Sequence, residues 1–251
     1  MSFTSVENAL EDIRQGRMII LVDDPHRENE GDLVFAAEKC TPDAVNFMRK
    51  EGGGLICLAM AGQMCDQLGL RAQVAENTSR MGTAFLESIE AREGVTTGIS
   101  AGDRSHTVLT AVAENARPED LSRPGHMFPL RARKGGVLVR PGQTEGSVDL
   151  ARLAGLRPAG VICEIMNEDG SMARMPELEV FAEKHDIKIL TVEQLIEYRR
   201  RREKLIERRV DDIRLPTHHG DFYAHLYHSL TDGKEHVALT YNWPHSPEDA
   251  G

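Results

Sequence analysis

Three carboxylates and a guanidinium group occur within the six residues from Arg27 to Asp32. If this segment is extended, the alternation of side chains along a strand places Glu28, Glu30 and Asp32 on one side. Carboxylate oxygens gathered in this way suit Mg²⁺, and a neighbouring arginine suits a phosphate group. The same spacing fits an acidic surface turn, so a metal and phosphate site and a solvated turn are both open interpretations.

Two later segments place a potential anion-binding or proton-transferring side chain beside glycine. The first reads Arg-Pro-Gly-His from Arg123 to His126, and the second reads Arg-Pro-Gly-Gln-Thr-Glu from Arg140 to Glu145. Because glycine lets the backbone approach a ligand closely, Arg140 and Thr144 are candidates for binding phosphate oxygens. An imidazole such as that of His126 can move protons near neutral pH, although an isolated histidine beside Pro-Gly is often structural.

A fourth candidate is Glu164, which follows the apolar run that begins at Val161. A carboxylate held among apolar neighbours can act as a general base. The alternative interpretation is a glutamate at a strand edge that faces water. The sequence leaves both open.

The hydrophobic pattern predicts alternating helices and strands that position these segments. Thr4-Ser5-Val6-Glu7 is a capping-box pattern, and apolar residues follow it at helical spacing up to Gly16. The branched run from Met18 to Val22 predicts a buried strand just before the acidic segment. Further strands are predicted at 54–59, 136–140, 160–165 and 187–191, and helices at 42–51, 105–115, 176–185 and 192–207. This alternation predicts an α+β fold, a single layered domain of mixed sheet and helices.

Length and charge limit the possible functions. A chain of 251 residues, 40% of them hydrophobic, has enough apolar sequence for one substantial core with an appendage. The net charge of −10 gives no overall attraction to nucleic acid or to anionic membranes, so a phosphate site must be a local basic pocket. The basic run from Arg199 to Lys204 lies on a helical pattern whose other face holds Leu195, Ile196 and Tyr198. This arrangement favours a solvated helix face over a nucleic-acid-binding patch.

The sequence contains no pattern typical of a membrane span, a signal peptide or a paired cysteine motif. No apolar run reaches the roughly 20 residues that span a bilayer, and the first segment lacks the basic start and apolar stretch of a signal peptide. We therefore expect a cytoplasmic protein without a membrane partner. The four cysteines, Cys40, Cys57, Cys65 and Cys163, form no Cys-x-x-Cys pair, so we expect four reduced thiols.

Four longer motifs resemble, in the same order along the chain, those of the 3,4-dihydroxy-2-butanone 4-phosphate synthase family. They read Asp-Asp-x-x-Arg-Glu-Asn-Glu-Gly-Asp at 23–32, Gly-Val-Thr-Thr-Gly-Ile-Ser-Ala at 94–101, Arg-Pro-Gly-His-x-Phe-Pro-Leu-Arg at 123–131 and Pro-Ala-Gly-Val-Ile-Cys-Glu-Ile at 158–165. The likeness spans about residues 5–205. Four long motifs in a fixed order are far more specific than one short motif.

The resemblance implies a magnesium- or manganese-dependent sugar-phosphate lyase of riboflavin biosynthesis. Such an enzyme converts D-ribulose 5-phosphate to 3,4-dihydroxy-2-butanone 4-phosphate and formate. The resemblance also implies a homodimer with its sites near the subunit interface. By the family's motifs, Glu28 and Gln143 bind the metal, Arg27, Asp32, Arg140, Thr144 and Glu164 contact the substrate, and His126 and Glu164 transfer protons.

Gln143 departs from the family's pattern. The motif reads Gly-His-Thr-Glu-Ala, whereas this chain reads Gly-Gln-Thr-Glu-Gly at 142–146. An amide oxygen is hard enough for Mg²⁺, but an amide carries no proton and is a weaker donor than imidazole. Leu86 also stands where threonine is usual. Two alternatives therefore remain open: a paralogue that acts on a pentulose phosphate with a different product, and a catalytically silent binding partner.

The C-terminal region resembles a second family. We expect residues 1–208 to form the synthase-like domain and residues 209–251 a tail. From Arg214 to Leu239 the tail resembles the opening of a GTP cyclohydrolase II domain, but no cysteine follows Cys163 to build the zinc site of that activity. We interpret the tail as a truncated, non-catalytic remnant. The stretch from Trp243 to Pro247 is predicted to lack regular structure.

Overall fold

The computed structural model describes residues 3–241, and the chain divides into two compact units, Met1–Tyr198 and Arg199–Gly251. The stretch from Trp243 to Pro247 lies outside the described residues. Within the described part of the chain, no helix has the length and apolar character needed to cross a membrane. The four cysteines are free, as predicted, and all four are buried.

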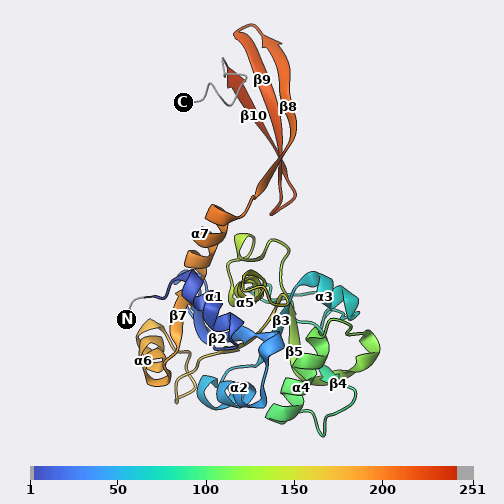
Figure 1. The fold of residues 1–251 in the computed structure, drawn as a ribbon, viewed down its shortest axis with the longest axis vertical. Helices are drawn as coiled ribbons and strands as arrows, with labels where there is room; N and C mark the ends of the chain where they lie inside the picture. The colour runs from blue at the N-terminus through green and yellow to red at the C-terminus, as the bar shows by residue number, and fades with distance from the viewer. Residues whose placement is uncertain (1–2, 242–251) are drawn as a thin grey trace. The chain divides into compact units, whose positions relative to one another are not determined.

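A seven-stranded mixed sheet forms the middle layer of the first unit (Figure 1). Its strands run in the order β4-β5-β3-β6-β2-β1-β7. The pairs β1–β7 and β3–β5 are parallel, and the remaining neighbours are antiparallel. The strands are β1 (Ile19–Val22), β2 (Gly31–Ala36), β3 (Cys57–Met60), β4 (Ile89–Ala91), β5 (Leu121–Arg131), β6 (Ala159–Glu164) and β7 (Lys188–Thr191).

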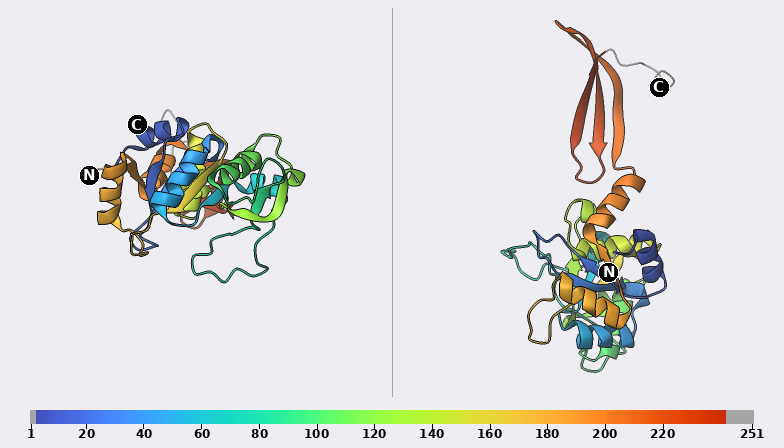
Figure 2. Two further views of the ribbon diagram at one scale, coloured as in Figure 1. Left: turned by 90° about the horizontal axis from the view of Figure 1, so that it is seen from below. Right: turned by 90° about the vertical axis from the view of Figure 1, so that its left-hand side faces the viewer.

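Helices cover both faces of this sheet (Figures 1 and 2), which confirms the predicted layered domain. One face carries α2 (Pro42–Phe47), α3 (Gly62–Gln67), α4 (Ala101–Val112) and α6 (Met175–His185). The other carries α1 (Val6–Arg14), α5 (Gln143–Leu153) and the start of α7 (Val192–Arg202). Strand alternation produces the two cores, because Ile20 packs in the first cluster and its neighbour Leu21 in the second.

Serine caps set the start of two helices. The Ser5 side chain accepts a hydrogen bond from the Asn8 N–H, which confirms the first helix near its predicted position. Ser100 likewise accepts from the Asp103 N–H, so α4 begins at Ala101 rather than at the predicted residue 105. The Gly94–Ala101 motif therefore ends on the first turn of α4.

Three further predicted elements were wrong in type or extent. The strand predicted at 136–140 is a 3₁₀ turn, Gly136–Leu138, because Asp149 accepts the Val137 N–H and Gly136 has a left-handed φ of 61°. The α-helix predicted at 42–51 ends at Phe47 and continues as a π-helical turn, Met48–Gly52. The helix predicted at 192–207 ends at Arg202, where a strand soon follows.

The second unit holds a three-stranded antiparallel sheet, formed by β8 (Ile206–Thr217), β9 (Gly220–Ser229) and β10 (Glu235–Tyr241) in the order β10-β9-β8. Register and alternation give this sheet one apolar face. The cross-strand rows on that face are Leu215, Phe222 and Tyr241; Ile213, Ala224 and Leu239; and Val210, Leu226 and Val237. The sequence pattern had not predicted these strands.

Candidate active site

A cavity of about 140 Å³ contains all the predicted site residues except His126. It lies on the face of the central sheet that α1 and α5 cover, because its strand residues belong to that core. Its lining comprises Arg27, Glu28, Glu30, Asp32, Cys57, Thr83, Phe85, Leu130, Arg140, Gln143, Thr144, Ile162 and Glu164. A larger hollow of about 750 Å³ beside α6 contains none of the predicted site residues. The chemistry therefore gathers in the smaller cavity.

The acidic segment is a turn rather than the extended strand considered from the sequence. Asn29 has a left-handed φ of 56°, and β2 begins only at Gly31, so Asp32 is the only one of the three carboxylates in this segment that lies on a strand. The Asp23 carboxylate accepts hydrogen bonds from the N–H groups of Glu28 (3.1 Å) and Glu30 (2.9 Å). Asp23 thereby folds the turn so that both glutamates still reach the cavity.

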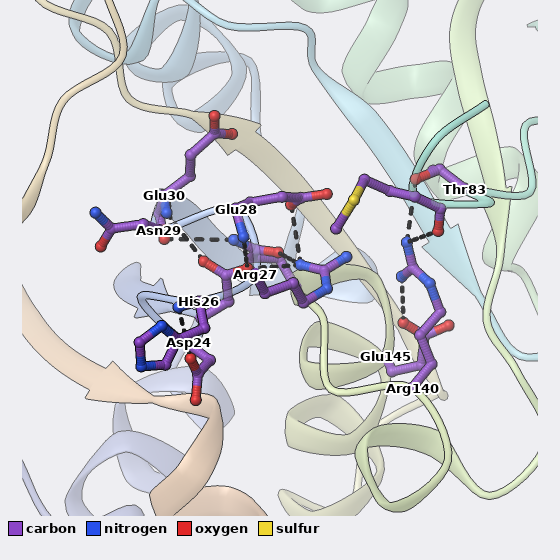
Figure 3. Close-up of polar contacts among 12 residues, drawn as sticks. Asp24, His26, Arg27, Glu28, Asn29, Glu30, Thr83, Arg140 and Glu145 are labelled. Atoms are coloured by element: carbon purple, nitrogen blue, oxygen red, sulfur yellow. Dashed lines mark hydrogen bonds and ion pairs between the residues drawn. The ribbon is translucent and has the colours of Figure 1, made fainter.

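Arg27 connects the acidic turn to the start of α5. Its Nη1 donates to Asp23 Oδ2 at 2.7 Å and to Glu28 Oε2 at 2.9 Å (Figure 3). The same nitrogen donates to Gln143 Oε1 at 3.0 Å, and Gln143 Nε2 donates to the Glu30 carbonyl at 3.3 Å. Both ends of the Gln143 amide are thus bonded to the acidic turn.

Arg174 also holds this turn, and the sequence interpretation missed it. Arg174 is the residue that precedes α6, and its Nη1 donates to the carbonyl oxygens of Glu28 (2.7 Å) and Asn29. An isolated arginine 145 residues away from Asn29 carries no local pattern that could reveal the contact. Its role depends on how α6 packs beside β2.

Asp32 and Glu164 bring two carboxylates together on neighbouring strands. Their Cα atoms are register partners on β2 and β6, and the Leu55 N–H donates to Glu164 Oε2 at 2.8 Å. Burial raises the pKa of Asp32 well above its usual value, and the negative charges of Glu164, Glu28 and Glu30 raise it further. The cavity is therefore lined by more carboxylates than positively charged side chains.

A second part of the cavity is suited to an anion. Arg140 Nη1 donates to Glu145 Oε2 at 2.7 Å, and Nη2 donates to Thr83 Oγ1 at 3.1 Å (Figure 3). A Cβ atom on Gly142 would lie 2.8 Å from Arg140 Nη1 and 2.9 Å from Arg27 Nη2, so both guanidinium groups approach this glycine. Gly142 is also the N-cap of α5, whose first backbone N–H groups attract anions.

His126 lies outside the cavity. It is on β5, its side chain is 45% exposed, and its Nδ1 is 2.5 Å from Glu90 Oε2. Phe128 on the same strand pairs with Cys57, which in turn pairs with Ile162. This register puts His126 level with Glu164 but two strands away, a separation of roughly 10 Å between backbones.

Comparison with known proteins shows which family this chain resembles. The family model for 3,4-dihydroxy-2-butanone 4-phosphate synthase matches residues 7–198. The riboflavin biosynthesis protein RibBA of Aquifex aeolicus is 58% identical over 95% of this chain and 59% of its own length. The 3,4-dihydroxy-2-butanone 4-phosphate synthase of Pseudomonas syringae pv. tomato is 54% identical over 95% of this chain and 64% of its own length. The chain thus spans about three fifths of the length of these curated relatives.

Solved structures give the same result. The two-domain 3,4-dihydroxy-2-butanone 4-phosphate synthase RibBX from A. baumannii superposes with a TM-score of 0.89 at 48% identity, covering 95% of this chain and 70% of that one. A 3,4-dihydroxy-2-butanone 4-phosphate synthase in complex with two magnesium ions superposes with a TM-score of 0.76 at 37% identity, covering 80% of this chain and 98% of that one. The chain belongs to the 3,4-dihydroxy-2-butanone 4-phosphate synthase family.

Proposed function

We propose that this protein is a lyase that converts D-ribulose 5-phosphate to 3,4-dihydroxy-2-butanone 4-phosphate and formate, in riboflavin biosynthesis in the cytoplasm. The observation that carries the proposal is one cavity with two chemically distinct parts. Four carboxylates, Glu28, Glu30, Asp32 and Glu164, line one part. The other part brings two guanidinium groups to the N-terminus of a helix. A polyol with a phosphate at one end matches this division.

The phosphate end of the substrate binds beside Gly142 in this proposal. Arg27 and Arg140 flank that glycine, and each is already oriented by a carboxylate, Asp23 and Glu145 respectively. Arg140 therefore presents its guanidinium without a large entropic cost of ordering. Thr144, in the first turn of α5, adds a hydroxyl group and a backbone N–H. Guanidinium groups and helix N-termini are both favourable partners for a phosphate dianion.

The adjoining part of the cavity fits Mg²⁺ or Mn²⁺. Glu28 and Gln143 offer oxygen ligands, which are the hard donors that both ions accept. The raised pKa of the buried Asp32 also reflects negative charge that a cation would offset. When bound, such a cation would stabilise negative charge that develops on the substrate oxygens.

Gln143 makes this a weaker metal site than the family's histidine would. Its Oε1 already accepts a hydrogen bond from Arg27, so a cation at its second lone pair would lie close to a guanidinium charge. The oxygen-only ligand set remains suitable for Mg²⁺. This contact is the specific observation that favours the second candidate, a protein that binds the sugar phosphate with little or no turnover.

Proton transfer is assigned to Glu164 and His126. The Leu55 N–H orients Glu164 Oε2 in the cavity, where the carboxylate can accept a proton from the substrate. Asp32 lies beside it and, with its raised pKa, can hold a proton that a later step needs. His126, level with Glu164 on the same sheet face, is the second proton-transfer group.

We further propose a homodimer whose interface lies beside the cavity. Leu55, whose backbone N–H donates to Glu164, is 42% exposed, and Val139, which precedes Arg140 in the chain, is 44% exposed. Large apolar side chains exposed around a cavity suit a surface that a second copy covers. Sedimentation equilibrium should give twice the chain mass of 27.9 kDa. A mass of one chain at micromolar concentration would contradict the dimer.

The role of the C-terminal region is part of the same proposal. We assign catalysis to residues 1–208 and no catalytic role to residues 209–251. The reaction itself is tested by incubation with ribulose 5-phosphate and Mg²⁺, followed by enzymatic measurement of formate and identification of the second product by NMR. Formation of both products in equal amounts supports the proposal, and a folded protein that releases neither contradicts it.

A further inference from the structure

Glu90 is a partly buried carboxylate that contacts the one predicted catalytic residue outside the cavity. Its side chain is 18% exposed, and its Oε2 lies 2.5 Å from His126 Nδ1. Among the described residues, the imidazole ring of His126 has no other hydrogen-bond partner. The second ring nitrogen, Nε2, is therefore available to a substrate.

The backbone around Glu90 is built to aim this carboxylate at His126. β4 shifts register between Ile89 and Glu90 where it pairs with β5, and such a bulge redirects the side chain that follows it. Gly125, next to His126, packs directly on this bulge, and a Cβ atom there would overlap the backbone of Ile89 and Glu90. The Gly125 N–H also donates to Ser88 Oγ at 3.1 Å. A side chain at position 125 would force the two strands apart.

A second glycine, Gly98, packs against the Glu90 carboxylate. Gly98 has a left-handed φ of 86°, and a Cβ atom there would overlap the Glu90 carboxyl group. Asp103 fixes this loop, because its carboxylate accepts hydrogen bonds from the N–H groups of Thr96 and Gly98, both at 3.1 Å. Two separate motifs of the sequence, at 94–101 and 123–131, thus each contribute a glycine to the packing of one glutamate.

We propose that Glu90 is the positioning residue of His126: its carboxylate holds the imidazole in the tautomer with hydrogen on Nδ1 and directs Nε2 toward the substrate. This inference rests on the proposed role of His126 in the lyase reaction. A carboxylate that accepts the Nδ1–H bond leaves the lone pair on Nε2, so the ring can take a proton there. The same carboxylate then stabilises the imidazolium that forms, and the proton leaves from Nε2 in the reverse transfer.

The tautomer gives a test that does not depend on turnover. In ¹⁵N-histidine-labelled protein, with the His126 signals assigned by comparison with His126→Gln, neutral His126 should carry its hydrogen on Nδ1. In Glu90→Gln, which keeps the side-chain shape, the population with hydrogen on Nε2 should rise. The matched control is Glu93→Gln, which removes the same charge from an exposed position three residues away and should leave the tautomer unchanged. An unchanged His126 tautomer in Glu90→Gln would overturn the proposal.

Kinetics test whether Glu90 acts through His126. Glu90→Gln should lower kcat for formate release by about 10²-fold, the lower end of what positioned acid–base groups contribute, with a small change in KM. The double variant Glu90→Gln/His126→Gln should be no slower than His126→Gln alone, because the glutamate then has no ring to position. Additive losses in kcat would contradict the proposal, since they would mean that Glu90 acts independently of His126.

The two tests separate failure of this inference from failure of the proposed function. If the wild-type protein releases no formate but Glu90→Gln alters the His126 tautomer, the lyase assignment fails and the pairing stands. If the wild-type protein releases formate and Glu90→Gln changes neither tautomer nor kcat, the lyase assignment stands and the positioning role is wrong.

Discussion

Asp32 and Glu164 face each other as register partners on the antiparallel strands β2 and β6, with Asp32 almost fully buried. Two carboxylates in this arrangement cannot both ionise without a large electrostatic cost unless a cation or a proton offsets one charge. The raised pKa of Asp32, caused first by burial and then by Glu164, is the consequence. The charge state of this pair therefore affects metal binding, the proton held on Asp32 and the stability of the fold.

Stability should fall as pH rises in the metal-free protein. The pKa of Asp32 is raised in the folded state, whereas the unfolded chain has a value of about 3.9. Between these two pKa values the folded state binds more protons than the unfolded state, so the free energy of unfolding decreases with increasing pH. Urea titrations in EDTA from acidic to neutral pH measure this slope. Asp32→Asn should flatten it, whereas Asp43→Asn on the surface should not; equal slopes in all three proteins would contradict the assignment.

Gly54→Ala should reduce turnover by displacing Glu164. A Cβ atom at position 54 would overlap Glu164 Oε2 and lie 2.6 Å from the Glu164 carbonyl oxygen. We expect kcat to fall by at least about 10²-fold, as for loss of a positioned general base. Gly102→Ala is the control, because the nearest atom to its new Cβ lies 3.7 Å away. A Gly54→Ala protein with normal kcat would show that the position of the Glu164 carboxylate is not critical.

Arg140→Lys should weaken substrate binding more than it slows turnover. Arg140 uses two guanidinium nitrogens, one on Glu145 and one on Thr83, and lysine cannot reproduce this geometry. We expect KM for ribulose 5-phosphate to rise on the order of 10-fold, in line with the loss of a charged hydrogen bond. Arg152→Lys at the other end of α5 serves as the control. A similar change in KM for both variants would argue against a phosphate site at Arg140.

Removing residues 209–251 should leave formate release largely intact. The first unit contains the complete cavity, and α7 ends at Arg202. Circular dichroism and thermal unfolding should give a cooperative transition for the shortened chain. Loss of folding or of turnover would mean that the three-stranded sheet supports the catalytic unit.

Gln143→His should strengthen metal binding and accelerate the reaction. Imidazole is a stronger metal ligand than an amide. Substitutions in the residues around the metal ligands alter metal affinity by about 10- to 100-fold, so replacing a direct ligand should change the affinity at least as much. Calorimetric titrations with Mg²⁺ or Mn²⁺ measure the affinity of each protein for the metal. Gln63→His on the exposed surface of α3 is the control. If the parent already matches the variant, Gln143 is a sufficient ligand; if only the variant releases formate, the parent is the divergent or silent protein.

The sequence predicted the fold class and the grouping of candidate residues in one cavity, but not every local element around them. Arg27, Glu28 and Arg140 line one cavity, as the family motifs implied, whereas the local pattern left open whether residues 27–32 are extended or form a turn, and the chain turns at Asn29. β5 was missed because proline and glycine at its centre are unusual inside a strand. β2 was not predicted because it begins with Gly31 and Asp32, so the apolar run that follows is too short to stand out as a strand.

Long-range contacts set the limit of the sequence interpretation. Glu90 had no pattern to mark it, since its pairing with His126 depends on a bulge and on two glycines from separate loops. The contact between Arg27 and Gln143 spans 116 residues and follows only from the packing of α5 on the sheet. Such relationships depend on register and packing, which local propensity does not specify.

The most direct test of the lyase assignment is the rate of formate release from ribulose 5-phosphate by the purified protein, measured with Mg²⁺ and again after EDTA treatment. Glu28→Gln serves as the matched variant, because it keeps the shape of the side chain but removes the carboxylate that binds the cation in this account. The account predicts steady formate release that EDTA abolishes, that added Mg²⁺ restores and that Glu28→Gln largely eliminates. Formate release that is unchanged by EDTA, or a folded wild-type protein that releases none with Mg²⁺ present, would contradict it.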